Sequence, residues 1–482
     1  MKSRNLWPAM AMLFLAAGCA NMRGLAPENE LTDIHSLSAD KSLAGARLSA
    51  TAWPATDWWR QLGDAQMDAV ISEALQGNPD LAIADARVRQ AAAESLGADA
   101  ARYPKIDAKG SLPGAQIPEG VMPELGGNYA TMKMLSVGGS YTFDLWGGER
   151  AAWESALGAQ RATEIDARAA RLTISTSVAS AYSALAYAFQ SHDIALADLD
   201  RANKLLDLTR QRVDAGVDSV AQLRQAESVS ASAEQKVAQT EQEIESSRTQ
   251  LSVLLGKGPD RGRDIQRPQA LHASELALPD NLPAELLGRR PDIVAARWRV
   301  ESARRGIDAA KAQFYPNVNL SATLGLLSVH TADLFQASSR FALVTPAISL
   351  PLFDGGRLRA NLAGRDAQYD LAVAQYNKTL VGALNQVADS LSRLRSLQTQ
   401  ESAQRRALSS AQQAFDLSMQ RYRNGVGAYL EVLIVQQSLH LAEDRMADIQ
   451  TRQIETSIEL IRALGGGYRA EQPVPTATAS TK

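Results

Sequence analysis

The sequence is poor in cysteine, in excess charge of either sign and in long apolar runs, and each shortage excludes a class of protein. Its one cysteine, Cys19, cannot form an intrachain disulfide. The 50 Lys and Arg residues nearly balance 53 Asp and Glu residues and form no basic run, so no nucleic-acid partner is predicted. No stretch reaches the 18 or more apolar residues expected of a transmembrane helix, so any membrane crossing would have to use β-strands.

The residues that carry most enzyme chemistry are also sparse. The histidines are scattered without metal-ligand spacing: His35, His192, His272, His330 and His440. Gly256-Lys257-Gly258 lacks the rest of a phosphate-binding loop, and it and residues 465–467 are typical of helix ends. Because no catalytic constellation is found, we predict no enzymatic activity, no metal site and no dissociable cofactor.

The N-terminus has the features of a secretory signal. Two basic residues precede an apolar segment, residues 5–17, that is too short to span a bilayer as a helix. Gly18-Cys19 then resembles the end of a bacterial lipobox, and Ala20 favours the outer membrane. We expect residues 1–18 to be a signal peptide and Cys19 to carry S-diacylglycerol and N-palmitoyl groups. The alternative is an ordinary signal peptide with an incidental cysteine.

The chain contains one unit used twice. Five motifs of the first half recur in the same order in the second: Asn78-Pro79-Asp80 as Arg290-Pro291-Asp292, Tyr103-Pro104 as Tyr315-Pro316, Phe143-Asp144 as Phe353-Asp354, Arg212 to Gly216 as Arg421 to Gly425, and Gly256 as Gly465. The shared order predicts a first repeat over residues 66–258 and a second over 282–467. An N-terminal segment (19–65), a linker (259–281) and a flexible tail (468–482) make up the rest.

Proline is absent from residues 124–258 and 352–472. Because a proline inside a helix costs about 3 kcal/mol or more, these stretches permit long helices, and good helix formers dominate them. Residues 150–212 could form one helix of about 63 residues, near 95 Å long, and residues 219–255 would return after a turn at Gly216. Such a helix belongs to no ordinary globular core. The signal peptide disfavours the alternative, a cytosolic coiled coil.

Four stretches between the expected helices alternate polar and apolar residues with a period of two. They are residues 104–112, 135–145, 314–326 and 344–352. Each is about 10 residues long, the length of a tilted transmembrane strand with lipid on one face and water on the other. A soluble antiparallel sheet packed on a core is the alternative. Known transmembrane barrels begin at about eight strands, so four strands would need those of other subunits.

Four segments carry a resemblance to a known family. They are Trp58-Trp59-Arg60-Gln61-Leu62-Gly63-Asp64 leading into Asn78-Pro79-Asp80, Leu282-Pro283 leading into Arg289-Arg290-Pro291-Asp292, Phe314-Tyr315-Pro316, and Arg421-Tyr422-Arg423-Asn424-Gly425. Together they resemble the TolC-like outer membrane factors, especially the lipoprotein branch that serves tripartite multidrug efflux systems. The resemblance covers about residues 58–467.

This resemblance implies a mainly α fold with a transmembrane β-barrel part. Each protomer would supply a long α-helical hairpin tunnel and four strands, with two internal structural repeats, and a homotrimer would complete a 12-stranded barrel. The implied function is an outer membrane channel, lipid-anchored and extending into the periplasm. It would passively conduct drugs or other small molecules from an inner membrane pump, of the resistance-nodulation-division type, through a periplasmic membrane-fusion adaptor.

Two other functions remain open at this point. One is an exit duct of the same fold for type I protein secretion or metal-ion efflux. The other is a structural lipoprotein that spans the periplasm and has no pore. The polar faces of the expected strands argue against the second, because a lipoprotein without a pore has no need of a water-facing strand surface.

The resemblance also assigns a docking surface. In this family the helical turns at the periplasmic end of the tunnel meet the adaptor. Here those turns are centred on Gly216 and Gly425, which would supply the left-handed backbone that closes each turn. Val217 and Val426 would then face the adaptor.

A periplasmic gate is implied just inside the second turn. The family's two acidic gate positions fall on Glu431 and Ile434, so only the first is acidic here. Three Glu431 carboxylates would ring the pore and favour cations, with Ile434 side chains beyond them. Tyr422 matches the family's gate tyrosine, and Gln222 stands where relatives have an aspartate, so we expect these two to hydrogen-bond between hairpins. The alternative for Glu431 is an ion pair with a nearby arginine such as Arg423.

Overall fold

A computed structural model describes residues 21–33, 36–37, 40–43, 53–116, 129–273 and 282–470. The predicted signal peptide, Cys19 and the tail beyond residue 470 lie outside the described residues. The chain divides into two compact units, and each contains segments from both halves of the sequence. The first unit comprises residues up to Leu31, Arg87–Thr163 and Ala296–Tyr376, and the second comprises Thr32–Ala86, Glu164–Ala295 and residues from Asn377 onward.

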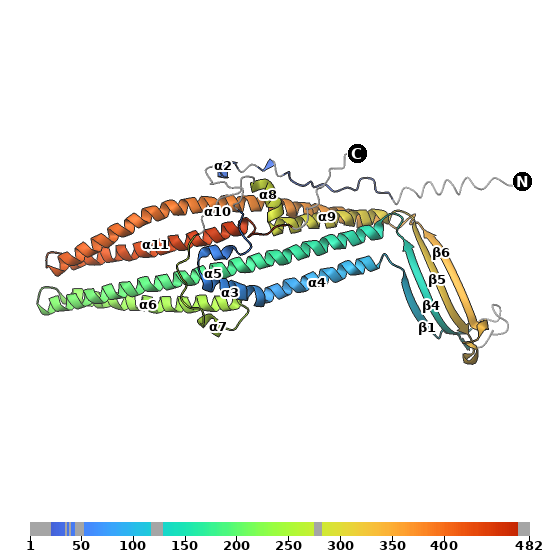
Figure 1. Cartoon of the computed structure of the whole chain (residues 1–482), viewed down its shortest axis with the longest axis horizontal. Coiled ribbons are helices and arrows are strands. Elements are labelled where there is room, and N and C mark those ends of the chain that lie inside the picture. The colour runs from blue at the N-terminus through green and yellow to red at the C-terminus, as the bar shows by residue number, and fades with distance from the viewer. Residues whose placement is uncertain are drawn as a thin grey trace. The chain divides into compact units, whose positions relative to one another are not determined.

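The first unit contains a four-stranded antiparallel sheet in the order β1–β4–β5–β6 (Figure 1). Its strands are β1 (Lys105–Ser111), β4 (Lys133–Phe143), β5 (Asn317–Ser328) and β6 (Arg340–Ser349). The four predicted strands are thereby confirmed. The predicted position of the last one, residues 344–352, is wrong, because β6 pairs with β5 over residues 340–349 and Ser349 lies opposite Asn317, the first residue of β5.

A second, two-stranded sheet was not predicted. It pairs β2 (Gly114–Gln116) with β3 (Tyr129–Thr131). Each strand has three residues, which is too short to show an alternating pattern in the sequence.

The repeated Phe-Asp motif joins a strand to a long helix in each half of the chain. Asp144 accepts hydrogen bonds from the N–H groups of Glu149 (3.1 Å) and Arg150 (2.8 Å) at the start of α5 (Gly148–Asp214). Asp354 accepts one from Leu358 (2.8 Å) at the start of α10 (Arg357–Arg423). A carboxylate here satisfies N–H groups that have no partner within the helix. Each helix has 67 residues, which confirms the predicted long helix.

In the second unit each long helix forms a hairpin with a shorter one (Figure 1). The returning helices are α6 (Val220–Leu254) and α11 (Tyr429–Ala463). Near the turns, one hydrophobic cluster takes Leu205 from α5, Ala226 from α6, Phe415 from α10 and Val432 from α11. Apolar burial by all four helices therefore holds the two hairpins together in this region.

The repeated Asn-Pro-Asp and Arg-Pro-Asp motifs cap the ends of the returning helices. Asn78 Nδ2 donates to the carbonyl oxygen of Leu254 (2.7 Å) at the end of α6. Arg290 Nη1 donates to the carbonyl oxygen of Ala463 (3.0 Å) at the end of α11. Equivalent residues of the two repeats thus satisfy equivalent helix ends, which otherwise lack partners. Pro79 and Pro291 each begin a new helix, so both repeats open with two consecutive helices.

The remaining helices are short or border these motifs. They are α2 (Asp40–Leu43), η2 (Trp58–Leu62), α3 (Ala65–Gly77), α4 (Pro79–Ala100), α7 (Asp260–Arg263), α8 (Leu282–Arg289), α9 (Pro291–Ala312), η3 (Thr331–Asp333) and η4 (Ala337–Ser339). Trp58 and Leu62 are buried in the main core of the second unit, and the partly buried Trp59 packs against that core. None of the helices within the described residues is long and apolar enough to cross a membrane.

Candidate functional site

Each hairpin turn is closed by a glycine in the left-handed conformation, as predicted. The φ angles are 72° at Gly216 and 77° at Gly425. The N–H of Val217 donates to the carbonyl oxygen of Arg212 (2.8 Å), and Val426 makes the equivalent bond in the second turn (3.0 Å). This pattern is a Schellman helix end, which requires positive φ at the glycine. A Cβ at either glycine would meet no atom within 4 Å, so backbone conformation alone demands glycine there.

The two turns expose apolar side chains. Val217 and Val426 are 62% and 70% exposed, and Val220 and Leu430, one turn further along, are also exposed. An exposed cluster of aliphatic side chains at a helix hairpin end is unusual for a surface that faces only water. We call Val217, Val220, Val426 and Leu430 the turn patch.

A buried polar cluster links the first turn to the second hairpin. The Tyr422 hydroxyl donates to Asp218 Oδ2 (2.5 Å), and Arg212 Nε donates to the same carboxylate (2.8 Å). Arg212 Nη1 also donates to the carbonyl oxygen of Tyr422 (3.1 Å), and the guanidinium carbon lies 4.5 Å from the centroid of the Tyr422 ring. Tyr422 is fully buried. We call Arg212, Asp218 and Tyr422 the inter-hairpin clasp.

The contacts within the clasp determine the protonation states of Asp218 and Tyr422. The hydrogen bond from Arg212 lowers the pKa of Asp218 below its ordinary value, with a smaller contribution from the Tyr422 hydroxyl. Burial raises the pKa of Tyr422, and its hydrogen bond to the Asp218 carboxylate raises it further. At neutral pH Asp218 is therefore ionised and Tyr422 keeps the proton that it donates.

Of the two residues expected to hydrogen-bond between hairpins, Tyr422 does so, whereas within the described residues the Gln222 side chain bonds only in its own turn. Gln222 Oε1 instead accepts from the N–H of Ser219 (2.6 Å), and Ser219 Oγ accepts from the N–H of Gln222 (3.3 Å). This reciprocal pair is a capping box, which arises because α6 begins at Val220 and puts Gln222 at its third position. Asp218, four residues earlier, is the residue that bonds Tyr422.

Sequence reasoning missed Asp218 and Arg212. A partial signal was available, because Arg212 recurs as Arg421 in the second turn whereas Asp218 has glycine, Gly427, as its counterpart. An acid present in only one of two equivalent turns indicates a contact that the repeats do not share. Its partner Tyr422 lies 204 residues away, so the contact itself is visible only in the structure.

Glu431 and Ile434 lie on the exposed side of α11. Ile434 is 58% exposed and Glu431 is exposed, whereas Val432 between them is fully buried. Residues three apart share a helix face, so the two side chains form one surface. Within the described residues of one protomer no ion pair joins Glu431 to Arg423.

The four-stranded sheet has one apolar and one polar face, as predicted. Across β4 and β5, Val137 is paired with Leu324, and these two are 54% and 64% exposed. On the opposite face Thr142 Oγ1 donates to Asn319 Oδ1 (2.7 Å). Side chains alternate between the faces of a strand, so this register separates apolar from polar residues over residues 135–143 of β4 and 318–326 of β5.

Cys19 is outside the described residues, but the segment that follows it is held along the start of α10. Arg359 Nη1 donates to the carbonyl oxygen of Asn21 (2.6 Å). Further along, Asp370 accepts hydrogen bonds from the N–H groups of Glu28 (3.0 Å) and Asn29 (2.8 Å). We call residues 21–29 the N-terminal strap. Its first residue lies beside Arg359, near the point where β6 passes into α10.

Three comparisons connect this geometry with known proteins. The family model described as outer membrane efflux protein matches residues 70–257 and 282–466. The multidrug resistance outer membrane protein MdtP of Escherichia coli (strain K12) is 30% identical over 467 residues, which cover 95% of each chain. The fusaric acid resistance protein FusA of Burkholderia cepacia is 39% identical over 363 residues, 74% of this chain and 68% of that one.

A solved structure extends the likeness to the fold. The outer membrane protein VceC of Vibrio cholerae is 35% identical, with a TM-score of 0.81 over 86% of this chain and 100% of that one. Members of the matched family form trimers and work with an adaptor and an inner membrane pump. The chain belongs to the outer membrane efflux protein family, the outer membrane channels of tripartite efflux pumps.

Proposed function

We propose that three copies of this chain form a lipid-anchored duct that passively carries small organic molecules from an adaptor and a resistance-nodulation-division pump to the exterior. The names of two relatives, a multidrug resistance protein and a fusaric acid resistance protein, support small organic molecules as cargo rather than secreted proteins.

The observation that carries this proposal is the four-stranded sheet with one apolar face. Within the described residues β1 and β6 each pair on one side only. An unpaired backbone group in lipid costs several kcal/mol, so the two edges need partners. Three sheets joined edge to edge would supply 12 strands, enough for a closed barrel with the polar faces lining a channel.

The mass of the purified protein in detergent tests the assembly. After correction for bound detergent we expect three chains per particle, because only pairing between copies removes the sheet edges. A stable monomer that retains its strand content would contradict the proposal.

A lipid anchor at Cys19 is supported by the N-terminal strap. The bond between Arg359 and Asn21 holds the strap two residues from Cys19 and beside the helix that follows β6. If the sheet crosses the membrane, Asn21 at the start of the strap lies near the bilayer surface, and the expected site of acylation precedes it by two residues in the sequence.

Adaptor docking is supported by the turn patch. Its aliphatic side chains are exposed at the hairpin ends, and covering them would remove apolar surface from water. Single cysteines at Val217 and Val426 should crosslink to an adaptor in cells. A cysteine at Gln239, on an exposed part of α6 away from the turns, serves as the control, and equal capture there would count against a docking surface at the turns.

A gate at Glu431 and Ile434 is supported by their shared exposed face near the second turn. In a trimer three Glu431 carboxylates would favour cations. Ile434 would add an apolar ring one turn further on. The inter-hairpin clasp would hold the hairpins of each protomer in register behind this ring.

A further inference from the structure

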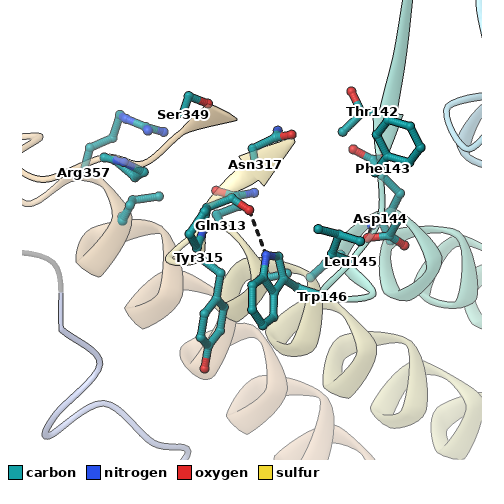
Figure 2. Close-up of a pocket in the computed structure, with 18 residues that line it drawn as sticks. Thr142, Phe143, Asp144, Leu145, Trp146, Gln313, Tyr315, Asn317, Ser349 and Arg357 are labelled. Carbon is teal, nitrogen blue, oxygen red and sulfur yellow. Dashed lines mark hydrogen bonds between the residues drawn. The ribbon is translucent and has the colours of Figure 1, made fainter. Parts of the chain in front are cut away.

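A hollow of about 510 Å³ lies where the two central strands of the sheet meet the helices (Figure 2). It is lined by the ends of β4, β5 and the edge strand β6 and by residues of α5, α9 and α10. Pockets of this size accept small organic groups.

Two aromatic rings form a rigid wall of this hollow. Trp146 and Tyr315 stack with centroids 4.7 Å apart and an interplanar angle of 21°. Trp146 Nε1 donates to the carbonyl oxygen of Pro316 (2.8 Å), which fixes the indole (Figure 2). Even so, the two residues remain 51% and 41% exposed. Tryptophan and tyrosine with one apolar and one polar end are typical of the membrane–water boundary.

Charges of both signs border the same hollow. Arg357 and Glu149 both line it, and Arg357 is on the far side of the stacked rings from Phe143 and Asp144 in Figure 2. Neither Arg357 nor Glu149 has an ion-pair partner in the part of the chain that the structure describes. Asp144 also lines the hollow, but its carboxylate is occupied by the N–H groups at the start of α5.

The hollow lies at the end of the sheet, where Phe143 of the apolar face lines it together with Thr142 and Asn317 of the polar face. The apolar residues of β4 end at Phe143, and beyond the strand ends Leu145, Leu352 and Phe353 are 62%, 48% and 76% exposed. If the apolar face of the sheet contacts acyl chains, the residues just beyond the strand ends lie at the level of the lipid headgroups.

We propose that this hollow binds the headgroup of a zwitterionic glycerophospholipid that carries both a phosphate and a primary ammonium group. Arg357 pairs with the phosphate, because a guanidinium matches its oxygens in a fork geometry. Glu149 pairs with the ammonium, and the face of Trp146 adds a cation–π contact. The acyl chains run along the apolar face of β4 and β5. This inference rests on the proposed membrane-spanning assembly.

Competitive lipid binding to the purified trimer tests the site. Delipidated trimer receives equal amounts of phosphatidylethanolamine and phosphatidylglycerol with distinguishable acyl masses, and native mass spectrometry counts the lipid retained. We expect wild type to prefer phosphatidylethanolamine. Arg357→Gln should lower retention of both lipids about tenfold, since both have a phosphate, whereas Glu149→Gln should abolish only the preference.

A matched control is Arg340→Gln, which removes an exposed arginine from the other end of β6 and should leave retention unchanged. Equal effects of Arg340→Gln and Arg357→Gln would overturn the site, and so would a preference that survives Glu149→Gln. If Arg357→Gln instead changes ion conductance and not lipid retention, the hollow faces the channel and the inference is wrong while the channel function stands. Absence of trimers in wild type would refute the proposed assembly itself.

Discussion

Replacing Asp218 with asparagine should release the first hairpin turn from the second hairpin. The carboxylate accepts from Arg212 at 2.8 and 3.2 Å and from Tyr422 at 2.5 Å. The side chains of Arg212 and Asp218 are only 15% and 6% exposed. Asparagine retains the shape but removes the charge, so the guanidinium stays largely buried without a counter-ion. Breaking a buried ion pair in this way costs about 3–5 kcal/mol.

We expect the lower end of that range, since the asparagine oxygen can still accept one of the bonds. About 3 kcal/mol corresponds to a factor of roughly 100 in the equilibrium for local opening. Hydrogen exchange of the trimer in detergent measures this equilibrium at single turns. The N–H groups of Val217 and Val426, which are bonded within the two turns, should exchange roughly 100-fold faster in Asp218→Asn.

Asp214→Asn is the matched control, because Asp214 is an exposed carboxylate in the same turn. In Asp214→Asn the N–H groups of Val217 and Val426 should exchange at the wild-type rate. Unchanged exchange at both turns in Asp218→Asn would refute the clasp. If hydrogen exchange also became roughly 100-fold faster far from the turns, for example at Leu251 in the main core, the substitution would destabilise the protein generally rather than release the turn locally.

Acid provides an independent test of the same contact. The pKa of Asp218 is lowered in the folded protein, so the clasp stabilises fully above the ordinary aspartate value of 3.8 and loses its contribution as pH falls through the lowered pKa. Asp218 therefore stays ionised between pH 5 and pH 7, and conductance through the tip should not change over that range. It should rise only in stronger acid, where Asp218 takes up a proton. A rise centred near pH 6 would point to a different group.

Three further predictions concern other parts of the molecule. Leu320→Arg on the apolar sheet face should impair membrane insertion, by about 2–4 kcal/mol at mid-bilayer, whereas Asn319→Arg on the polar face should be tolerated; equal amounts of both variants in outer membrane fractions would contradict the assigned faces. Intact-mass analysis of the purified protein should show lipid on a chain that starts at Cys19. A mature chain without lipid that starts at another residue would refute the proposed lipid anchor. Glu431→Gln should move the reversal potential in a salt gradient toward zero by weakening cation preference, and an unchanged potential would mean that Glu431 does not line the gate.

The parts of the fold with local signals could be predicted from the sequence. Proline-free stretches indicated the two 67-residue helices, and period-two alternation indicated the four strands of the main sheet. The repeated glycines indicated the turns, because positive φ restricts the residue type strongly. The start of β6 could not be placed in this way, since its pairing with β5 decides its extent and its own alternation is weak.

The contacts that join distant segments had no local signal. The bond between Asp218 and Tyr422, the strap contact of Asn21 with Arg359 and the stacking of Trp146 on Tyr315 each link residues far apart in the chain. Gln222 shows the limit most clearly. The resemblance to the family implied a partner for its side chain across the hairpins, but Gln222 Oε1 accepts from the N–H of Ser219 in the capping box at the start of its own helix.

Ion current through the purified trimer in planar bilayers tests the central claim most directly. We expect discrete current steps, small in wild type because the clasp holds the tip together, and larger in Asp218→Asn, with Asp214→Asn resembling wild type. A structural lipoprotein without a pore would pass no current in any of these variants. Absence of current from Asp218→Asn, in bilayers where insertion of the trimer has been verified, would contradict the channel function.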